Sequence, residues 1–330
     1  MISVVICTFE RHSIVLNLIN SLLDELEHSD EILIIDSSEE LLNITNNKVR
    51  VYRSIHKNQL YQRLLGRELA RNSWCLFLDD DMLPKHRGTL AEIKTLRSQF
   101  VEPIGFAINF ENYYEQHSLS VHENTDAQKN FYKTTKRFFG ISSLPPGKVG
   151  WNGARGTQPQ NGHTEWFSGG AFYVKREYFF TNMDYRMLSL FERKIGMAED
   201  LLLSYGLSAT GKLIAVDRSM FWHMDNSTNS NYSTNVYRYE KRVMTSRLLI
   251  NLFIANIKQE KVYRAIVLYN LYFLSKIVTT ILFTNTRKKD RLLGQINGYF
   301  WSFNILFWDK EKHKKYWHKR LRFNLEEYNE

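Results

Sequence analysis

The stretch Trp74-Cys75-Leu76-Phe77-Leu78-Asp79-Asp80-Asp81 decides the fold class of this chain of 330 residues. Its five apolar residues predict a buried strand, and three carboxylates follow directly at the carboxyl end of that strand. This is the edge at which an open α/β sheet binds its ligands. Because adjacent carboxylates repel one another, we expect a hard divalent cation to neutralise them. The alternative is an acidic patch that only decorates the surface.

Strands and helices alternate on both sides of this stretch. Apolar spacing predicts strands over 2–8, 31–36, 49–53, 74–78, 104–109, 166–174 and 212–217, and helices over 13–26, 59–71 and 197–208. Strands separated by helices of this length form a mostly parallel sheet with helices on its faces. We therefore predict an α/β fold of Rossmann-like architecture. The segment 111–139 has only weak helical spacing.

Several acidic side chains follow predicted strands and should line one crevice at the carboxyl edge of the sheet. Glu10, Asp36 and the cluster 79–81 each come directly after a strand. Magnesium and manganese take oxygen ligands and bind through one or two carboxylates together with phosphate oxygens. A nucleoside diphosphate held through such a metal fits this arrangement, since the metal would neutralise charge on a diphosphate leaving group.

A second pair of carboxylates, Glu199 and Asp200, lies in the first turn of the predicted helix 197–208. Helix starts attract acidic residues for ordinary reasons, because the macrodipole stabilises negative charge there by about 0.3–1 kcal/mol. Since neighbouring helical positions point in different directions, one carboxylate can face the crevice while the other anchors the loop. The carboxylate in the crevice would suit a general base that deprotonates an acceptor hydroxyl.

His223 and Arg63 are further candidates for the site. His223 follows a predicted strand and can complete a metal shell, although a histidine beside Phe221 and Trp222 is more often a packed core side chain. Arg63 and Arg67 lie one turn apart on a predicted helix. They can meet phosphates or a nucleobase, or else form a solvated face.

The segment 144–170 is rich in Gly, Pro, Asn and Gln, so we expect a mobile loop or a pair of hairpin turns. Loops of this length inside compact domains are usually functional lids or disordered segments. Gly169 and Gly170 lie inside the predicted strand 166–174. A glycine pair there suits a close approach of the backbone to a ligand, and a bulge without function is the alternative.

The net charge of +9 is confined to the last third of the chain. Residues 231–330 hold 19 Lys and Arg against 8 Asp and Glu, whereas residues 1–230 hold 25 against 27. A basic tail suggests an anionic phospholipid surface nearby, or a solvated surface that aids solubility. The chain starts with a strand-like segment instead of a leader, and Cys7 and Cys75 lie in predicted core strands, so we expect a cytoplasmic location.

Beyond about residue 235 the pattern is helical and basic. The apolar run 265–283 has Lys276 near its centre, which costs a spanning helix on the order of 3 kcal/mol. We favour a helix that packs on the domain or lies in the membrane interface over one that spans. The tail 299–323 interleaves aromatic residues with Lys and Arg, which suits lipid head groups or stacking with single-stranded nucleic acid.

Segments within residues 1–225 resemble, in order, the motifs of the family 2 glycosyltransferases, which have the GT-A fold. These segments are 4–11, the strand 31–38, the stretch 58–66, the acidic stretch 76–84, the segment 165–177 and Ala198-Glu199-Asp200. The stretch 76–84 is a close match to the family's Asp-x-Asp motif. The departures from the family pattern are Cys7, Phe9, Glu10, Ser37 and Leu64.

The resemblance implies roles for individual residues. It makes Asp81 the direct metal ligand, Asp79 a nucleotide or second metal contact, and His223 a further metal ligand. It implies nucleotide contacts for Thr8, Glu10, Asp36, Arg63, Asp79 and Asp80. The donor sugar and the acceptor would meet Trp166, Gly169, Gly170 and Glu199. Asp200 would then be the base of an inverting reaction.

We therefore predict a GT-A type catalytic domain over 1–230 and a helical, basic and aromatic extension over 231–330 that can associate with a membrane. The predicted enzyme uses Mn²⁺ or Mg²⁺ to transfer a sugar, with inversion, from a nucleotide-diphospho-sugar, a UDP-sugar, to a hydroxyl of a glycan or lipid-linked acceptor. Bacterial cell-surface polysaccharide synthesis is the expected setting. The protein would be peripheral at the inner face of the cell membrane, with no nucleic-acid partner.

Two other functions stay open at this stage. A sugar-phosphate nucleotidyltransferase also uses a nucleotide-binding α/β sheet, but the turn 8–11 lacks the glycine-rich phosphate loop which that chemistry wants. A non-catalytic nucleic-acid-binding protein should be basic near its crevice, yet residues 1–230 carry a small negative charge.

Overall fold

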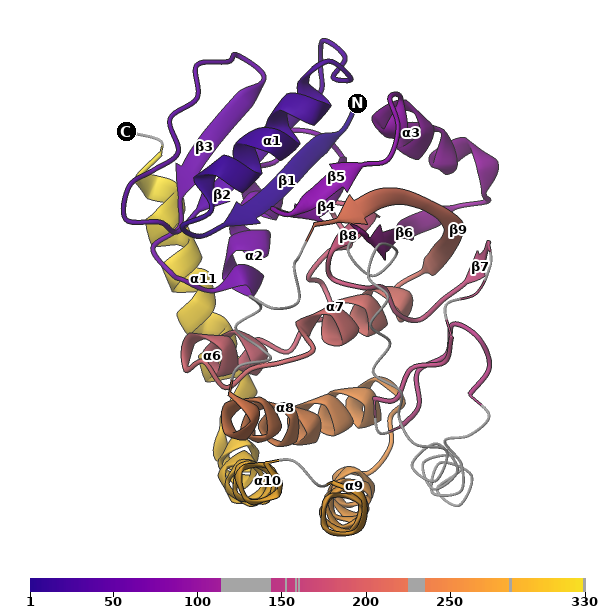
Figure 1. Ribbon diagram of the computed structural model, residues 1–330, viewed down its shortest axis with the longest axis vertical. Coiled ribbons are helices and arrows are strands. Elements are labelled where there is room, and N and C mark those ends of the chain that lie inside the picture. Colours follow the sequence, from indigo (N-terminus) through magenta and orange to yellow (C-terminus); the bar gives the residue numbers. More distant parts are fainter. Residues whose placement is uncertain are drawn as a thin grey trace.

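A nine-stranded sheet organises the part of the chain that the computed structural model describes, residues 1–113, 144–151, 153–157, 159, 161–224, 235–284 and 287–328 (Figure 1). The strands are β1 (Ser3–Thr8), β2 (Glu31–Asp36), β3 (Val49–Arg53), β4 (Trp74–Asp79), β5 (Met82–Pro84), β6 (Pro103–Asn112), β7 (Gly162–His163), β8 (Ala171–Lys175) and β9 (Lys212–His223). Their order is β3-β2-β1-β4-β8-β6-β9-β5, and β7 pairs with β9.

The sheet is parallel along β3-β2-β1-β4, as predicted, so these four strands end at one edge. β8 then enters antiparallel between β4 and β6, and β6 runs parallel to β9. The short β5 pairs antiparallel with β9, where Met82 lies opposite His223. This last pairing brings the residues after the acidic cluster to the end of β9.

Helices cover both faces of the sheet, because successive strand residues point to opposite sides. Val4 and Ile6 of β1 pack with the cluster that contains α1 and α3, whereas Val5 packs with the cluster that contains α2 and α7. The helices are α1 (His12–Leu23), α2 (Gln59–Leu69), α3 (Thr89–Gln99), α6 (Arg186–Glu192), α7 (Glu199–Ser208), α8 (Val236–Ile257), α9 (Val262–Phe283), α10 (Lys288–Ser302) and α11 (Lys310–Glu326), with a 3-10 turn over Phe303–Phe307.

Both cysteines are buried core residues, as predicted. Cys7 and Cys75 are free thiols on β1 and β4. Burial raises the pKa of each thiol to about 12, so both stay protonated and behave as small apolar side chains.

The C-terminal helices pack back on the first 230 residues. α11 runs past α6 and α2 to β3 (Figure 1). The Trp317 side chain is buried, and its Nε1 donates a hydrogen bond of 2.9 Å to Oγ of Ser189 on α6. Asn324 Nδ2 donates to the backbone oxygen of Arg53 at 3.1 Å. The division into two domains stays a prediction, but α8 and α11 share the core cluster of α2 and α7.

One described helix, α9, is long and apolar enough to cross a membrane. Five of its apolar residues, spaced three or four apart, are exposed along one side: Val267, Leu271, Leu274, Val278 and Ile281. We call this set the α9 stripe. Lys276 lies on the inner side, where its Nζ is 3.8 Å from Oε2 of the buried Glu240 on α8. The charge near the centre of the helix therefore faces protein.

The structure corrects several predicted boundaries. Residues 166–170 are irregular, and β8 begins only at Ala171. β9 continues from the predicted strand through to His223. β5 and α3 have no counterpart in the prediction, because β5 is three residues long and α3 is only weakly amphipathic. Of the segment 111–139, residues 111 and 112 end β6 and residues 114–139 lie outside the described residues.

Candidate functional site

The acidic cluster lies at the carboxyl edge of the parallel strands. β1 and β4 pair with Cys7 opposite Asp79, so the residues after these strands are neighbours. Thr8 Oγ1 donates a hydrogen bond of 2.8 Å to Oδ2 of Asp80. Arg11 bridges the next two carboxylates, with Nη1 2.7 Å from Oδ1 of Asp80 and Nη2 3.0 Å from Oδ2 of Asp81. One arginine thus offsets part of the repulsion within the cluster.

Asp80 and Asp81, the second and third carboxylates of the cluster, have pKa values that are shifted in opposite directions. Burial raises the pKa of Asp80 to about 7, although Arg11 and the Thr8 hydrogen bond act in the opposite direction. Burial also acts to raise the pKa of Asp81, but the neighbouring His223, together with Arg11, lowers it below its usual value. Asp81 is therefore the carboxylate that its neighbours hold in the ionised form.

His223 reaches Asp81 because β5 pairs with β9. Asp81 precedes Met82, which lies opposite His223 in that ladder. His223 Nε2 is 3.3 Å from Oδ1 of Asp81. That oxygen is buried and accepts no well-formed hydrogen bond from the described residues.

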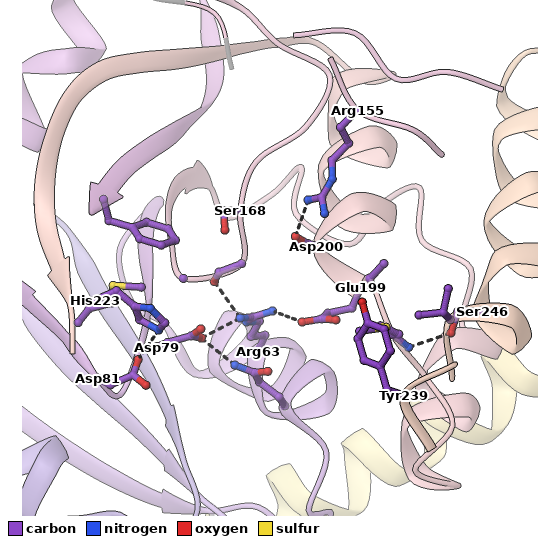
Figure 2. A pocket seen from close by; sticks show the side chains of 18 of the residues that line it. Arg63, Asp79, Asp81, Arg155, Ser168, Glu199, Asp200, His223, Tyr239 and Ser246 are labelled. Atoms are coloured by element: carbon purple, nitrogen blue, oxygen red, sulfur yellow. Dashed lines mark hydrogen bonds and ion pairs between the residues drawn. The ribbon is translucent and has the colours of Figure 1, made fainter. Parts of the chain in front are cut away.

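Arg63 joins the acidic cluster to the second pair of carboxylates. Figure 2 shows its guanidinium, which rises from α2, between Asp79 and Glu199. Nη2 is 2.9 Å from Oδ1 of Asp79 and donates a second bond of 2.9 Å to the backbone oxygen of Gly169, while Nη1 is 3.4 Å from Oε1 of Glu199. Gln59 Nε2 donates to the same Asp79 oxygen at 2.7 Å.

The Arg63 side chain is only 3% exposed, so this contact is a buried charge pair with two acids. Burial acts to lower the pKa of Arg63, but Asp79 and Glu199 outweigh it and raise the pKa above its usual value. Burial raises the pKa of Glu199, and the neighbouring charge of Asp200 raises it further. The ion pair with Arg63 holds the Glu199 carboxylate in place beside the cavity.

Asp200 points to the other side of the α7 start, as the helical geometry predicts. Its Oδ1 accepts the Leu201 backbone N–H at 2.8 Å, and its Oδ2 accepts Arg155 Nη1 at 2.9 Å (Figure 2). The Arg155 guanidinium lies 5.1 Å above the Trp166 ring. Ala198, just before α7, has φ of 61°, a left-handed conformation that costs a non-glycine residue energy and turns the chain sharply into the helix.

Arg155 comes from the glycine-rich segment, for which a mobile loop or a pair of hairpin turns was predicted, and it lies on a hairpin there. Val149 and Arg155 form an antiparallel bridge, and Gly153 adopts a φ of 71° at its turn. A Cβ on Gly153 would lie 2.7 Å from Cγ2 of Ile250 and 2.8 Å from Nη1 of Arg247. The hairpin therefore lies directly against α8.

The glycine pair allows a close approach of side chains to the backbone. A Cβ on Gly170 would lie 2.2 Å from Cε of Met82 and 2.9 Å from Cζ of Phe110. A Cβ on Gly169 would lie 3.3 Å from Nη2 of Arg63. The Gly170 backbone oxygen accepts the Asp79 N–H at 2.9 Å, which fixes the pair beside the acidic cluster.

The acidic cluster, Arg63, the glycine pair and the start of α7 line one open cavity of about 1050 Å³. Of the predicted site residues, it collects Arg63, Asp79, Asp80, Asp81, Gly169, Gly170, Glu199, Asp200 and His223. The prediction missed other lining residues, among them Arg11, Gln59, Arg155, Tyr239, Arg247, Tyr272 and Lys276. Arg11 lies three residues after the end of the first strand, and that position near the carboxyl edge is a signal which could have found it.

Four predicted site residues do not line this cavity: Thr8, Glu10, Asp36 and Trp166. The Asp36 carboxylate is fully buried and holds the loop after β2, where it accepts the N–H groups of Ser38 at 2.8 Å and Leu42 at 3.0 Å. Glu10 is exposed and accepts the Glu39 N–H at 2.9 Å. Thr8 reaches the site only through Asp80.

The donor set at Asp81 fits a metal that is bound together with a nucleotide. Among the described residues, no three His, Cys, Asp or Glu side chains converge as ligands of one ion. Asp81 and His223 offer one carboxylate oxygen and one imidazole nitrogen. Magnesium and manganese are typically held by one or two protein groups, with phosphate oxygens and water completing the shell. The pair therefore fits a metal–diphosphate complex.

The sequence and the structure were compared with those of known proteins to find the class of protein to which this chain is similar. Residues 3–144 match the family model described as Glycosyl transferase family 2. This region contains the acidic cluster, and its match supports the prediction that the chain is a glycosyltransferase similar to those of family 2. The mostly parallel sheet with helices on both faces is the predicted α/β fold. The chain has no match among the curated proteins.

Several solved structures are similar to this chain at low identity. TarS 1-349 of S. aureus in complex with UDP-GlcNAc is 11% identical with a TM-score of 0.49, over 90% of this chain and 81% of that one. Glucosyl-3-phosphoglycerate synthase from Mycobacterium tuberculosis, in complex with Mn²⁺, UDP and glucosyl-3-phosphoglycerate, is 12% identical with a TM-score of 0.41, over 79% and 81%. The mannosyltransferase PcManGT from Pyrobaculum calidifontis, with GDP-Man and Mn²⁺, is 10% identical with a TM-score of 0.43, over 92% and 86%.

Proposed function

We propose that this glycosyltransferase is metal-dependent and inverting, and that it moves a sugar from a nucleotide-diphospho-sugar, a UDP-sugar, to a hydroxyl of a glycan or lipid-linked acceptor. The observation that carries this proposal is the placement of Asp81 with His223 and of Asp200 on one cavity. Arg63 connects their neighbours in the sequence, Asp79 and Glu199. The family match favours this function over a nucleotidyltransferase or a nucleic-acid-binding protein.

In this proposal Asp81 and His223 would hold Mn²⁺ or Mg²⁺, with Asp79 and Asp80 beside the nucleotide. A metal bound there would supply positive charge to the departing diphosphate. Arg11 and Arg63 hold the carboxylates in place through the contacts described above. The Gly169–Gly170 backbone leaves room beside them for the donor sugar.

Asp200 would remove the proton from the acceptor hydroxyl. The hydroxyl oxygen attacks the anomeric carbon as the bond from that carbon to the diphosphate oxygen breaks, and the diphosphate leaves with the bonding electrons. One such displacement inverts the anomeric centre. Arg155 donates one hydrogen bond to Oδ2 of Asp200, and the carboxylate keeps further lone pairs with which it can accept the acceptor hydroxyl.

Isothermal titration of the protein with a panel of nucleotide-sugars, with and without Mn²⁺, tests the donor assignment. We expect one donor class to bind, and to bind more tightly with the metal. No binding by any donor under either condition would overturn the proposal. Asp81→Asn should remove the metal dependence, since a neutral amide is a weak ligand for a hard cation.

Asp200→Asn tests the base. We expect the variant to bind the donor as the wild type does but to transfer sugar to a panel of glycans and lipid-linked glycans at least 100-fold more slowly, because the amide accepts no proton. Asp217→Asn is the matched control, since Asp217 is an exposed carboxylate of β9 outside the cavity lining. Wild-type transfer by Asp200→Asn would exclude Asp200 as the base.

We further propose that the protein is peripheral at the inner face of a bacterial cell membrane and acts in cell-surface polysaccharide synthesis. The α9 stripe is exposed on a helix whose charged centre faces Glu240. α11 adds five Lys and two Arg against two Glu. An apolar stripe together with basic residues suits the head-group region of an anionic bilayer.

A further inference from the structure

The wall of the cavity opposite the acidic cluster comes from two C-terminal helices. α8 contributes Tyr239 and Arg247, and α9 contributes Tyr272 and Lys276. The Arg247 guanidinium lies 4.8 Å above the Tyr272 ring. Lys276 is one helical turn after Tyr272, so both cations lie on the same wall.

This wall differs in charge from the rest of the cavity. All the carboxylates that line the cavity, among the described residues, belong to the acidic cluster or to the start of α7: Asp79, Asp80, Asp81, Glu199 and Asp200. The lining residues of α8 and α9 include no carboxylate. The charged ones among them are Arg247 and Lys276.

One buried carboxylate, Glu240, lies behind the wall. Glu240 is buried and lies 3.8 Å from Lys276 Nζ, but it is closer to a cation of α10, with Oε1 3.0 Å from Arg291 Nη1. Gln295 Nε2 also donates to Glu240 at 3.1 Å. One buried carboxylate is thus shared by cations of two helices, Lys276 of α9 and Arg291 of α10.

We propose that Arg247 and Lys276 bind a phosphate group of the acceptor. The proposal rests on the glycosyltransferase function proposed above and names the acceptor class: a hydroxyl compound that carries a phosphate. Arg is suited to bidentate contacts with phosphate oxygens, and Lys adds a point charge that can follow the ligand. Asp200 lies on the same cavity, so a phosphate held at this wall leaves the acceptor hydroxyl within the space that Asp200 faces.

Calorimetric titration with inorganic phosphate, at saturating UDP and Mg²⁺ so that the donor site is filled, tests the inference. We expect millimolar binding to the wild type and at least tenfold weaker binding to the Arg247→Gln/Lys276→Met double variant. Arg264→Gln is the matched control, because Arg264 is an exposed cation of α9 outside the cavity lining. It should bind phosphate as the wild type does.

Two single variants separate charge from folding. Lys276→Arg keeps the charge and should retain phosphate affinity within about threefold, whereas Lys276→Met should weaken it. Circular dichroism of both variants reports the fold. A repeat with monododecyl phosphate distinguishes the sources of the group: tighter binding than inorganic phosphate indicates a lipid-linked acceptor, and equal binding a soluble one.

No phosphate binding by the wild type, or equal binding by the double variant, would overturn the inference. The proposed function has a different failure: no nucleotide-sugar binds at all. The phosphate titration is also made without nucleotide, so that the comparison of wild type and double variant stands in either case.

Discussion

Arg63 is the residue at which the two acidic groups of the site meet. Its guanidinium contacts Asp79, Glu199 and the backbone oxygen of Gly169 from one buried position. The planar, forked donor set of arginine makes these three contacts possible, whereas the single ammonium of lysine cannot span them. The relative position of the acidic cluster and the start of α7 therefore depends on this side chain.

Gly170→Ala should reduce the stability of the fold more than Gly169→Ala does. At position 170 the new methyl would lie 2.2 Å from Met82 Cε and 2.9 Å from Phe110 Cζ, so both of these side chains must move. We expect a loss of about 1–3 kcal/mol in the free energy of unfolding, measured in urea, together with weaker metal-dependent donor binding.

Gly169→Ala is the matched control for that change. Its methyl meets Arg63 Nη2 at 3.3 Å and other atoms at 3.5 Å or more, which needs only a small adjustment. Equal stability losses for the two variants would contradict the packing explanation.

Among the secondary-structure elements, α3 is attached to the start of β2 by a buried ion pair. Lys94 Nζ lies 2.7 Å from Oδ2 of Asp30, whose side chain is fully buried. The Ile2 and Glu27 N–H groups also donate to Asp30, at 2.9 and 3.0 Å. Burial acts to raise the pKa of Asp30, but Lys94 and these N–H groups lower it below its usual value.

Lys94→Met should cost about 3 kcal/mol in the free energy of unfolding at pH 7, because it leaves a buried carboxylate without its cation. In the wild type, a lowered folded-state pKa gives stability that is present above pH ~4 and is lost as the pH falls through that pKa. In the variant the cation is gone, so burial raises the pKa of Asp30. Protonation of Asp30 then removes its buried negative charge. The difference between the two proteins in urea unfolding should therefore shrink below about pH 5.

Asp30→Asn combined with Lys94→Met should recover part of the loss, since the buried charge is then removed. Lys212→Met replaces an exposed lysine and serves as the control. A stability difference that does not change between pH 7 and pH 4 would contradict this account.

The sequence predicted those parts of the site that follow from strand order. Asp79, Asp80 and Asp81 lie where a parallel strand ends, and that edge is fixed by the alternation of strands and helices. Asp36 follows the same rule but turns inward, because the N–H groups of its own loop compete for its oxygens. Periodicity places a residue at an edge; it does not say which hydrogen bonds its side chain will make.

The remaining lining residues could not be predicted from local pattern. Arg155 lies in an irregular hairpin, and Arg247 and Lys276 lie on helices whose docking brings them to residues about 200 positions earlier in the chain. Their place depends on how helices pack on the sheet, which apolar spacing alone leaves open. The inward position of Lys276 likewise depends on Glu240, a partner on another helix.

At the scale of the whole molecule, the α9 stripe predicts binding to bilayers. The full chain should bind vesicles that contain anionic phospholipid, and binding should weaken with added salt because the basic residues contribute. Leu274→Gln/Val278→Gln should reduce the vesicle-bound fraction at least tenfold in a sedimentation assay, since two exposed apolar side chains on the order of 1.5–3 kcal/mol each would no longer enter the interface.

Val101→Gln controls for a general loss of surface apolarity. Val101 is exposed on the loop between α3 and β6, away from α9. Undiminished binding by the α9 double variant would exclude the stripe as the membrane contact. Self-association of the wild type that the double variant lacks would point to a second copy of the chain instead.

The buried Glu240 has a consequence for how α9 can sit at a lipid surface. A helix that is apolar along most of its length can roll about its own axis at little cost. Here the contact of Glu240 with Lys276, and of Gln295 with Thr280 at 2.9 Å, ties one side of α9 to α8 and α10. These polar contacts fix the rotation of the helix, so that it turns the same side toward lipid and the same cation toward the cavity.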